Sequence, residues 1–162
     1  VETAVASGAQ EVQAVINISA LKSGDMTRFR RDLEAVLNAS HLTGITQEAQ
    51  ETLTEFVLET SYLTQRETTV VSELVREIGG EFLVTATGYA PGTATTDDVR
   101  LIRRSVGATM GVKAVGGIRT LQLATDLLNA GANRIGTTAG VHLVEEFFAA
   151  SEERALAGAG RR

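Results

Sequence analysis

The stretch GVKAVGGIRTLQLATDLLNAGANRIGTTAG, residues 111–140, contains one complete strand–helix–strand unit. Its ends, Gly111–Gly117 and Arg134–Thr138, are short apolar runs bounded by glycine or polar residues, which is typical of strands buried on both faces. Between them, Thr120–Ala130 places leucine and alanine at helical spacing and is closed by Gly131. This unit predicts two parallel strands joined by a right-handed helical crossover.

The same alternation extends back to the start of the chain. Further strands are predicted at Glu11–Asn17, Glu55–Thr60 and Phe82–Thr87. Further helices are predicted at Val1–Ser7, Asp25–Ala39, Thr64–Ile78, Asp97–Val106 and Val141–Ala150. Residues 40–54 break the pattern because they lack a core face. They are predicted to form a surface excursion with a short helix at Thr46–Leu53.

Five strand–helix units place the chain in the α/β class and fit either a doubly wound sheet or a (β/α)8 barrel. The barrel is favoured because polar and glycine signals repeatedly follow the strands, where barrels carry their working residues. An eight-stranded barrel takes about 250 residues, so five units do not close one. We therefore predict a partial barrel domain over residues 1–150, with earlier strands missing from this sequence, and a flexible C-terminal tail over residues 151–162.

The composition narrows the possible functions. The chain has 162 residues, of which 43% are hydrophobic and 22% charged, and a net charge of -5. This acidic balance disfavours nucleic-acid and membrane-surface partners, and no apolar run is long enough to span a membrane. There is no cysteine and the two histidines lie far apart in sequence, so neither a metal site nor a cofactor is expected. No signal peptide is visible, which predicts a cytoplasmic protein.

Lys113 is one of only two lysines and lies within an apolar strand, where burying its charge is costly. The alternative is that its ammonium simply reaches solvent at the strand end. Beyond it, Gly116 and Gly117 let a ligand approach the backbone, while the last strand runs into Thr137 and Thr138 at a helix N-terminus. Many barrels bind phosphate at their last two strand-to-helix loops, so we predict a phosphate site here rather than two plain turns.

Five stretches, taken together and in chain order, resemble deoxyribose-phosphate aldolase, a class I aldolase family with a (β/α)8 barrel. They are AVASGAQEVQAVINISALKSGD (4–25), VLETSYLT (57–64), FLVTATG (82–88), TTDDVRLIRRSVGATMGVKAVGGIRT (95–120) and AGANRIGTTAG (130–140). The resemblance implies that this chain supplies strands 4 to 8 of the family barrel. It also implies lyase chemistry in which acetaldehyde and glyceraldehyde 3-phosphate are joined through a lysine Schiff base.

The resemblance also implies roles for single residues. The family's second lysine, whose charge lowers the pKa of the Schiff-base lysine, falls on Lys113. The Schiff-base lysine itself falls on Val84, and the aspartate that assists proton transfer falls on Gln13. Valine has no nucleophile and glutamine does not transfer protons at neutral pH, so the resemblance implies a diverged active site.

Three functional hypotheses remain open. The first is a repurposed enzyme on the aldolase scaffold, in a specialised biosynthetic pathway. Its catalytic candidates are Lys113, Glu59, Gln13 and Thr85, and its candidates for binding substrate or phosphate are Gly116, Gly117, Arg119, Thr137, Thr138, Asn17 and Tyr62. The second is a working aldolase that uses Lys113 as its Schiff-base lysine. The third is a non-catalytic pseudoenzyme or interaction subunit.

The expected partners follow from the same observations. A small-molecule substrate is expected, and the two glycine and threonine loops favour a phosphorylated one. An arc of five units has two open strand edges and an uncovered inner side, and open edges invite pairing. We therefore predict that the chain forms a homo-oligomer, or is completed by another chain or by an N-terminal segment outside this sequence.

Overall fold

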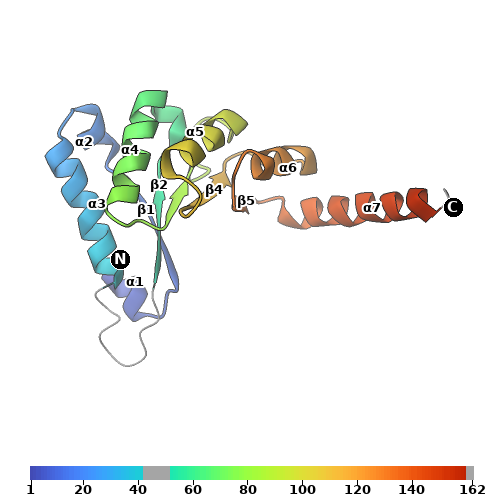
Figure 1. The fold of residues 1–162 in the computed structure, drawn as a ribbon. Coiled ribbons are helices and arrows are strands. Elements are labelled where there is room, and N and C mark those ends of the chain that lie inside the picture. Colours follow the sequence, from blue (N-terminus) through green and yellow to red (C-terminus); the bar gives the residue numbers. More distant parts are fainter. Residues whose placement is uncertain (42–51, 160–162) are drawn as a thin grey trace.

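The computed structural model of the chain describes residues 1–41 and 52–159, in which strands alternate with helices (Figure 1). The strands are β1 (Glu11–Val15), β2 (Leu53–Val57), β3 (Phe82–Val84), β4 (Gly111–Val115) and β5 (Arg134–Gly136). The helices are α1 (Glu2–Ala6), α2 (Ile18–Lys22), α3 (Met26–His41), α4 (Gln65–Glu77), α5 (Thr96–Val106), α6 (Leu121–Asn129) and α7 (Gly140–Ala159), with a short 3-10 helix η2 (Thr60–Tyr62). Every predicted strand is present, as are the helices predicted at Val1–Ser7, Asp25–Ala39, Thr64–Ile78, Asp97–Val106, Thr120–Ala130 and Val141–Ala150.

The strands form one parallel sheet in the order β1-β2-β3-β4-β5, so neighbours in space are also neighbours in sequence. A doubly wound sheet reverses its strand order part-way, whereas a barrel adds each strand beside the preceding one. The strand order therefore confirms the barrel type of arrangement. Among the described strands, β1 and β5 each pair with a single neighbour, so the arc has two open edges.

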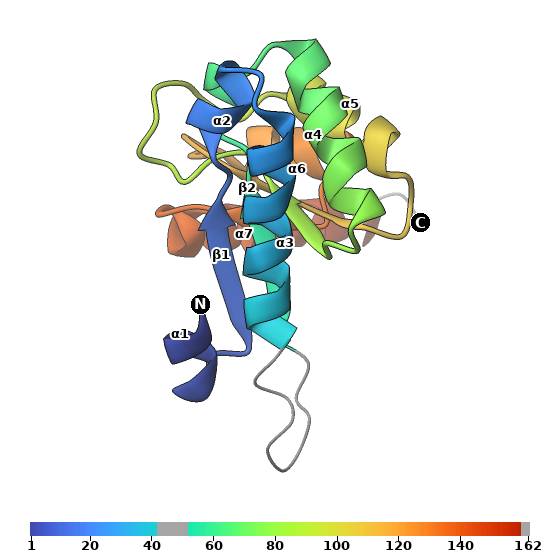
Figure 2. The ribbon, with the colours of Figure 1, turned by 90° about the vertical axis from the view of Figure 1, so that its left-hand side faces the viewer.

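A hydrophobic core lies between the sheet and helices α3 to α6, which cover its outer side (Figures 1 and 2). Successive side chains of a strand face opposite sides, so alternate strand residues enter this core. Phe56, Leu83 and Val112 do so and are fully buried. The residues between them, among them Glu55 and Val84, consequently face the inner side of the arc.

Side-chain caps fix where the chain turns from strand to helix. Thr64, Thr95 and Thr120 each accept a hydrogen bond from the backbone N–H three residues on, at 3.2, 3.0 and 3.3 Å. Asp25 does the same for α3, because its Oδ1 accepts from the N–H of Arg28 at 3.0 Å. Such caps satisfy N–H groups that have no partner within the helix.

The start of β2 differs from the sequence prediction, which assigned residues up to 54 to a surface excursion. The strand begins at Leu53, and Thr54 is fully buried with its hydroxyl hydrogen-bonded to that of Ser40 in α3. A threonine-rich stretch thus supplies a strand because the hydroxyl groups satisfy each other inside the core. Most of the predicted helix Thr46–Leu53 lies outside the described residues.

The C-terminal boundary also differs. Helix α7 continues past the predicted end at Ala150 as far as Ala159, since residues 151–159 are mostly alanine, glutamate, leucine and arginine, which favour helix. The start of α7 packs against α6, where the Leu121 N–H donates to Glu146, and its C-terminal part extends away from the rest of the fold (Figure 1). The flexibility of residues 151–162 stays a prediction. In the described part of the chain, no helix is both long and apolar enough to cross a membrane.

Candidate functional site

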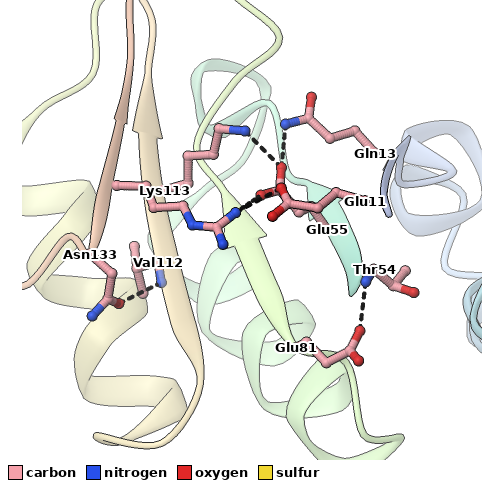
Figure 3. Close-up of polar contacts among 9 residues, drawn as sticks. Glu11, Gln13, Thr54, Glu55, Glu81, Val112, Lys113 and Asn133 are labelled. Carbon is pink, nitrogen blue, oxygen red and sulfur yellow. Dashed lines mark hydrogen bonds and ion pairs between the residues drawn. The ribbon is translucent and has the colours of Figure 1, made fainter. Parts of the chain in front are cut away.

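The inner side of the arc brings charged side chains from four strands together. In the register of the sheet, Gln13 lies beside Glu55, and Val84 lies beside Lys113, which in turn lies beside Arg134. Paired residues of neighbouring parallel strands point to the same side, so these side chains share the inner face. We call Glu11, Gln13, Glu55, Lys113 and Arg134 the inner-face cluster (Figure 3).

Glu55 is the centre of this cluster. Its side chain has no exposed surface, and its two carboxylate oxygens accept from three donors. Lys113 Nζ lies 2.9 Å from Oε2, which also accepts a hydrogen bond from the side-chain amide of Gln13. Arg134 Nη1 lies 3.1 Å from Oε1. A buried carboxylate is stable only when paired and hydrogen-bonded, and this one is satisfied on both oxygens.

Arg134 connects the cluster to the edge strand β1. Its Nη1 also lies 2.8 Å from Glu11 Oε2, and its guanidinium carbon lies 4.3 Å from the centroid of the Phe82 ring. The hydrogen bond to Glu11 is the main reason that the pKa of Arg134 is raised above its ordinary value. With two carboxylates, one ammonium and one guanidinium, the cluster carries no net charge.

Val84 occupies the middle of the inner face. Its side chain is fully buried, and its strand neighbours in register are Val57 and Lys113. Lys113 is one strand away, and 20% of its side chain is exposed. The centre of the inner face therefore holds one amine, which is ion-paired, and no other nucleophilic side chain beside it.

Glu59 lies at the carboxyl end of β2 in a left-handed backbone conformation, with φ 54°. Within the described chain it is the one non-glycine residue with positive φ. Its Oε1 accepts hydrogen bonds from the backbone N–H of Thr87, at 2.9 Å, and from the Thr87 hydroxyl. Its Oε2 is buried without a hydrogen-bond partner among the described residues. Strained backbone and an unpaired buried oxygen are both features that concentrate at functional sites.

The two predicted phosphate loops lie side by side. Gly116 and Gly117 have φ values of +119° and +64°, which glycine adopts without strain. The Thr137 hydroxyl donates to the carbonyl of Ile118 at 2.5 Å and accepts from the N–H of Ala139 at 2.9 Å, so it joins the loops. Gly117, Thr138 and Arg119 are exposed, and no ion pair links Arg119 to another described residue.

The other candidates have structural partners. The Thr85 hydroxyl is fully buried, donates to the Val115 carbonyl at 2.7 Å and accepts from the Val115 N–H at 2.9 Å, so it joins β3 to β4. Asn17 caps α2 through the N–H of Ala20 at 3.0 Å and donates to Asp32 at 2.5 Å. Tyr62 is half exposed on η2. The structure thus leaves Glu59 and Lys113 as candidate reactive groups, and ties Thr85 and Asn17 to the scaffold.

Cavities lie at both ends of the described strands. One of about 380 Å³ lies at the carboxyl ends of β2 to β4 and is lined by Thr60, Ser61, Gln65, Ala86, Thr93, Asp98 and neighbouring residues. A larger one, of about 500 Å³, lies at the opposite end of β3 and β4, where Glu81, Met110 and Asn133 line it. The first is at the end of the sheet where barrels carry their sites. In the described residues, no three histidine or carboxylate groups converge as metal ligands.

The chain is similar to known proteins in both sequence and fold. The chain is 46% identical to the deoxyribose-phosphate aldolase of Thermococcus gammatolerans over 142 residues, which cover 88% of this chain and 60% of that protein. It is 45% identical to the deoxyribose-phosphate aldolase of a Thermoanaerobacter species over 89% of its own length and 62% of that protein. The chain is therefore similar to deoxyribose-phosphate aldolases over most of its own length.

Structural comparison agrees with this similarity. QR15, an aldolase, matches with a TM-score of 0.79 at 36% identity, over 91% of this chain and 62% of that one. The deoxyribose phosphate aldolase of Aeropyrum pernix shares the fold, with a TM-score of 0.74. No protein-family model matches the chain. The chain spans about three fifths of the length of the curated relatives that it matches, so its five strands correspond to part of their barrel.

Sequence reasoning singled out Lys113 but missed Glu55, Arg134 and Glu11, which form the rest of its charged surroundings. The signal that identified Lys113 was a charge within an apolar strand, and Glu55 between Thr54 and Phe56 carries the same signal. Strand alternation places both side chains on the inner face. Their contact across two strands could be anticipated only by combining this alternation with the strand order.

Proposed function

We propose that this protein is a diverged deoxyribose-phosphate aldolase that lacks ordinary aldolase activity and performs another reaction on a small phosphorylated substrate in the cytoplasm. The observation that carries the proposal is Val84, which stands at the position of the family's Schiff-base lysine and is fully buried. A Schiff base requires an amine, and an aliphatic side chain supplies none. Gln13, at the position of the family's aspartate, uses its amide to donate to Glu55 and exchanges no proton at neutral pH.

The test is cleavage of deoxyribose 5-phosphate by the natural protein and by variants. We expect no cleavage from the natural sequence and none from Val84→Lys with Gln13→Asp, because Glu55 would then face a second carboxylate and pair with the new lysine. Adding Glu55→Gln to this pair should restore measurable cleavage. Cleavage by the natural protein at the rate of an ordinary aldolase would overturn the proposal.

A phosphate site forms the second part of the proposal. Its support is the junction of the two loops at Thr137, the exposed glycine at 117 and the free guanidinium of Arg119. The backbone N–H groups of Gly117 and Thr138 donate to no other described residue, so they are available to an anion. This arrangement supports binding of the phosphate of the substrate at the carboxyl end of the last two strands.

A working aldolase that uses Lys113 is the alternative enzyme. One observation favours it, since Lys113 is next to residue 84 in the register of the sheet and its side chain is partly exposed. The ion pair with Glu55 opposes it, because a nucleophile needs a neutral amine and the pair uses the charged ammonium. Borohydride reduction in the presence of acetaldehyde, followed by peptide mapping, distinguishes the two, because an adduct at Lys113 during turnover would support this alternative.

A non-catalytic subunit is the third possibility, and the open edges of β1 and β5 favour it. Val15 on β1 leaves about half of its side chain exposed on the inner face, where a closed barrel would cover it. We propose that a second copy, another chain or an N-terminal segment of the same protein pairs with these edges. Pairing of these edges is compatible with both the repurposed enzyme and the working aldolase. The cleavage assay therefore decides between catalytic and non-catalytic roles.

A further inference from the structure

We propose that Glu55 is a positioning residue that holds Lys113 in an unreactive ion pair and thereby decides whether this lysine can attack a carbonyl group. The inference rests on the proposed function, since it explains why the one lysine on the inner face does not replace the lysine missing at Val84. It is carried by the geometry of the inner-face cluster and by the burial of Glu55 (Figure 3).

The Glu55 carboxylate is fixed in place from both sides. Gln13 and Lys113 donate to Oε2, and Arg134 donates to Oε1 at 3.1 Å. Turning the carboxylate away from Lys113 would break the contacts to Gln13 and Arg134 as well. Arg134 is itself held by Glu11 at 2.8 Å, so the anchor extends to the neighbouring strand β1.

The ion pair between Glu55 and Lys113 is more buried than the ion pair of the other lysine, Lys22. Glu55 has no exposed side-chain surface and Lys113 has 20%, so little water screens their attraction. Lys22, the second lysine of the chain, pairs with Glu67 at 2.7 Å, but these side chains are 40% and 26% exposed. Exposed pairs contribute little because water and salt screen them.

The chemical consequence concerns the lone pair of Lys113 Nζ. Schiff-base formation begins when this lone pair attacks the carbonyl carbon and a proton moves from nitrogen to oxygen, which gives a carbinolamine. The carbinolamine hydroxyl then takes up a proton and leaves as water, and the nitrogen lone pair forms the double bond of an iminium ion. An ammonium that is hydrogen-bonded to a carboxylate has no lone pair for the first step, so the reaction stops before the carbon–nitrogen bond forms.

The experiment uses acetaldehyde as the carbonyl probe and borohydride as the reductant, which adds hydride to the iminium carbon and leaves an ethyl group on the lysine. The chain has only two lysines, so peptide mapping by mass spectrometry separates Lys113 from the internal reference Lys22. In the folded natural protein we expect Lys113 to be ethylated at least about tenfold more slowly than Lys22. In Glu55→Gln, which keeps the shape of the side chain, we expect its rate to rise about tenfold or more.

Two controls separate the ion pair from general effects of charge. Glu11→Gln removes a carboxylate from the same cluster but contacts Arg134 rather than Lys113, so the ethylation rate of Lys113 should change by less than about twofold. Glu67→Gln frees Lys22 from its exposed pair and should likewise change the rate of Lys22 little. Circular dichroism and urea unfolding confirm that each variant is folded. If Glu55→Gln does not fold, Glu55→Met removes the charge with an apolar side chain of similar volume, a kind of replacement that buried ion pairs often tolerate.

Two results would overturn the inference: Lys113 reacting as fast as Lys22 in the natural protein, or Lys113 remaining as slow in a folded Glu55 variant. The second result would mean that burial alone, rather than Glu55, protects the amine. Failure of the proposed function appears in a different measurement. Cleavage of deoxyribose 5-phosphate by the natural protein while Lys113 stays slow would overturn that function and leave the role of Glu55 intact.

Discussion

Gln13 and Glu55 form a matched pair at the scale of single residues. The amide of Gln13 donates to a carboxylate that has no exposed surface and that already neutralises Lys113 and Arg134. A neutral donor suits this position because a buried carboxylate gains from each hydrogen bond and loses from each nearby negative charge. The glutamine is therefore the residue that the surrounding charges require.

Replacing Gln13 by aspartate tests this match. Gln13→Asp places two carboxylates on adjacent strands of the inner face, and we expect the free energy of unfolding to fall by about 1–3 kcal/mol at neutral pH. Urea unfolding followed by circular dichroism measures the change. Gln10→Asp, at an exposed position just before β1, is the control and should change stability by less than about 0.5 kcal/mol. Equal stability of the two variants would contradict the role that we assign to Gln13.

The residues of the site were only partly predictable from sequence. Lys113 lies in the middle of β4, whereas Gly117 and Thr137 follow the ends of β4 and β5, and the local pattern singled out all three as candidates. Glu55 and Arg134 contact each other from strands that are far apart in sequence, so no local sequence pattern predicts this contact. Thr85 was predicted to be catalytic from its place at a strand end, but its hydroxyl satisfies the backbone of Val115.

At the scale of elements, helix α4 shows how one carboxylate serves two structures. Glu67 completes the capping box at Thr64, accepting from its N–H at 2.7 Å, and also binds Lys22 of α2 at 2.7 Å. Together these hydrogen bonds lower the pKa of Glu67 from 4.5 to about 2, and the one from Lys22 has the largest effect. The carboxylate therefore stabilises the fold above about pH 4.5 and loses this contribution as the pH falls toward 2.

Glu67→Gln isolates the effect of this charge, since glutamine also serves in a capping box. We expect the variant to have a slightly lower urea midpoint than the natural protein at pH 7, because an exposed pair contributes little. The difference should shrink as the pH falls from about 4.5 to about 2, where the folded carboxyl takes up its proton. Glu73→Gln, on the exposed side of the same helix, should show no such trend. A difference that stays constant over this pH range would contradict the assignment.

The loop between β4 and α6 offers a second test at this scale. Inorganic phosphate should raise the melting temperature of the natural protein, because a ligand that binds the folded state stabilises it. Gly117→Glu should abolish the rise, since it adds a negative charge at positive φ, where the Cβ atom would lie 2.9 Å from Thr93 Oγ1. Gly107→Ala is a matched control with φ +76° and open space around it, and it should keep the phosphate-dependent rise. A rise retained in Gly117→Glu would count against the phosphate site.

At the scale of the whole molecule, the architecture was the most predictable feature. Five apolar runs separated by amphipathic helices specify parallel strands, and the sequential strand order follows from short connections of one hand. Boundaries were less predictable because tertiary contacts set them. Thr54 joins β2 through its hydrogen bond to Ser40, which the polar character of residues 40–54 conceals.

The open edges predict association of the isolated chain. Light scattering should give a mass above that of one chain, because β1 and β5 present unpaired backbone groups among the described strands. Val15→Lys, on the exposed inner side of β1, should lower the average mass by placing a charge at the edge. Val70→Lys, on helix α4, is the control for an added lysine and should leave the mass unchanged. A single-chain mass at all concentrations would show that the edges are protected without a partner.

The hydrogen bond between Gln13 and Glu55 also constrains the order in which this sequence can change. An aspartate at position 13 lowers stability while Glu55 keeps its charge, and a neutral residue at 55 leaves Lys113 and Arg134 without their shared anion. Each first step toward the family's lysine and aspartate thus lowers stability before any chemistry is gained. Placing a lysine at position 84 and an aspartate at position 13 without loss of stability would therefore require several substitutions at once.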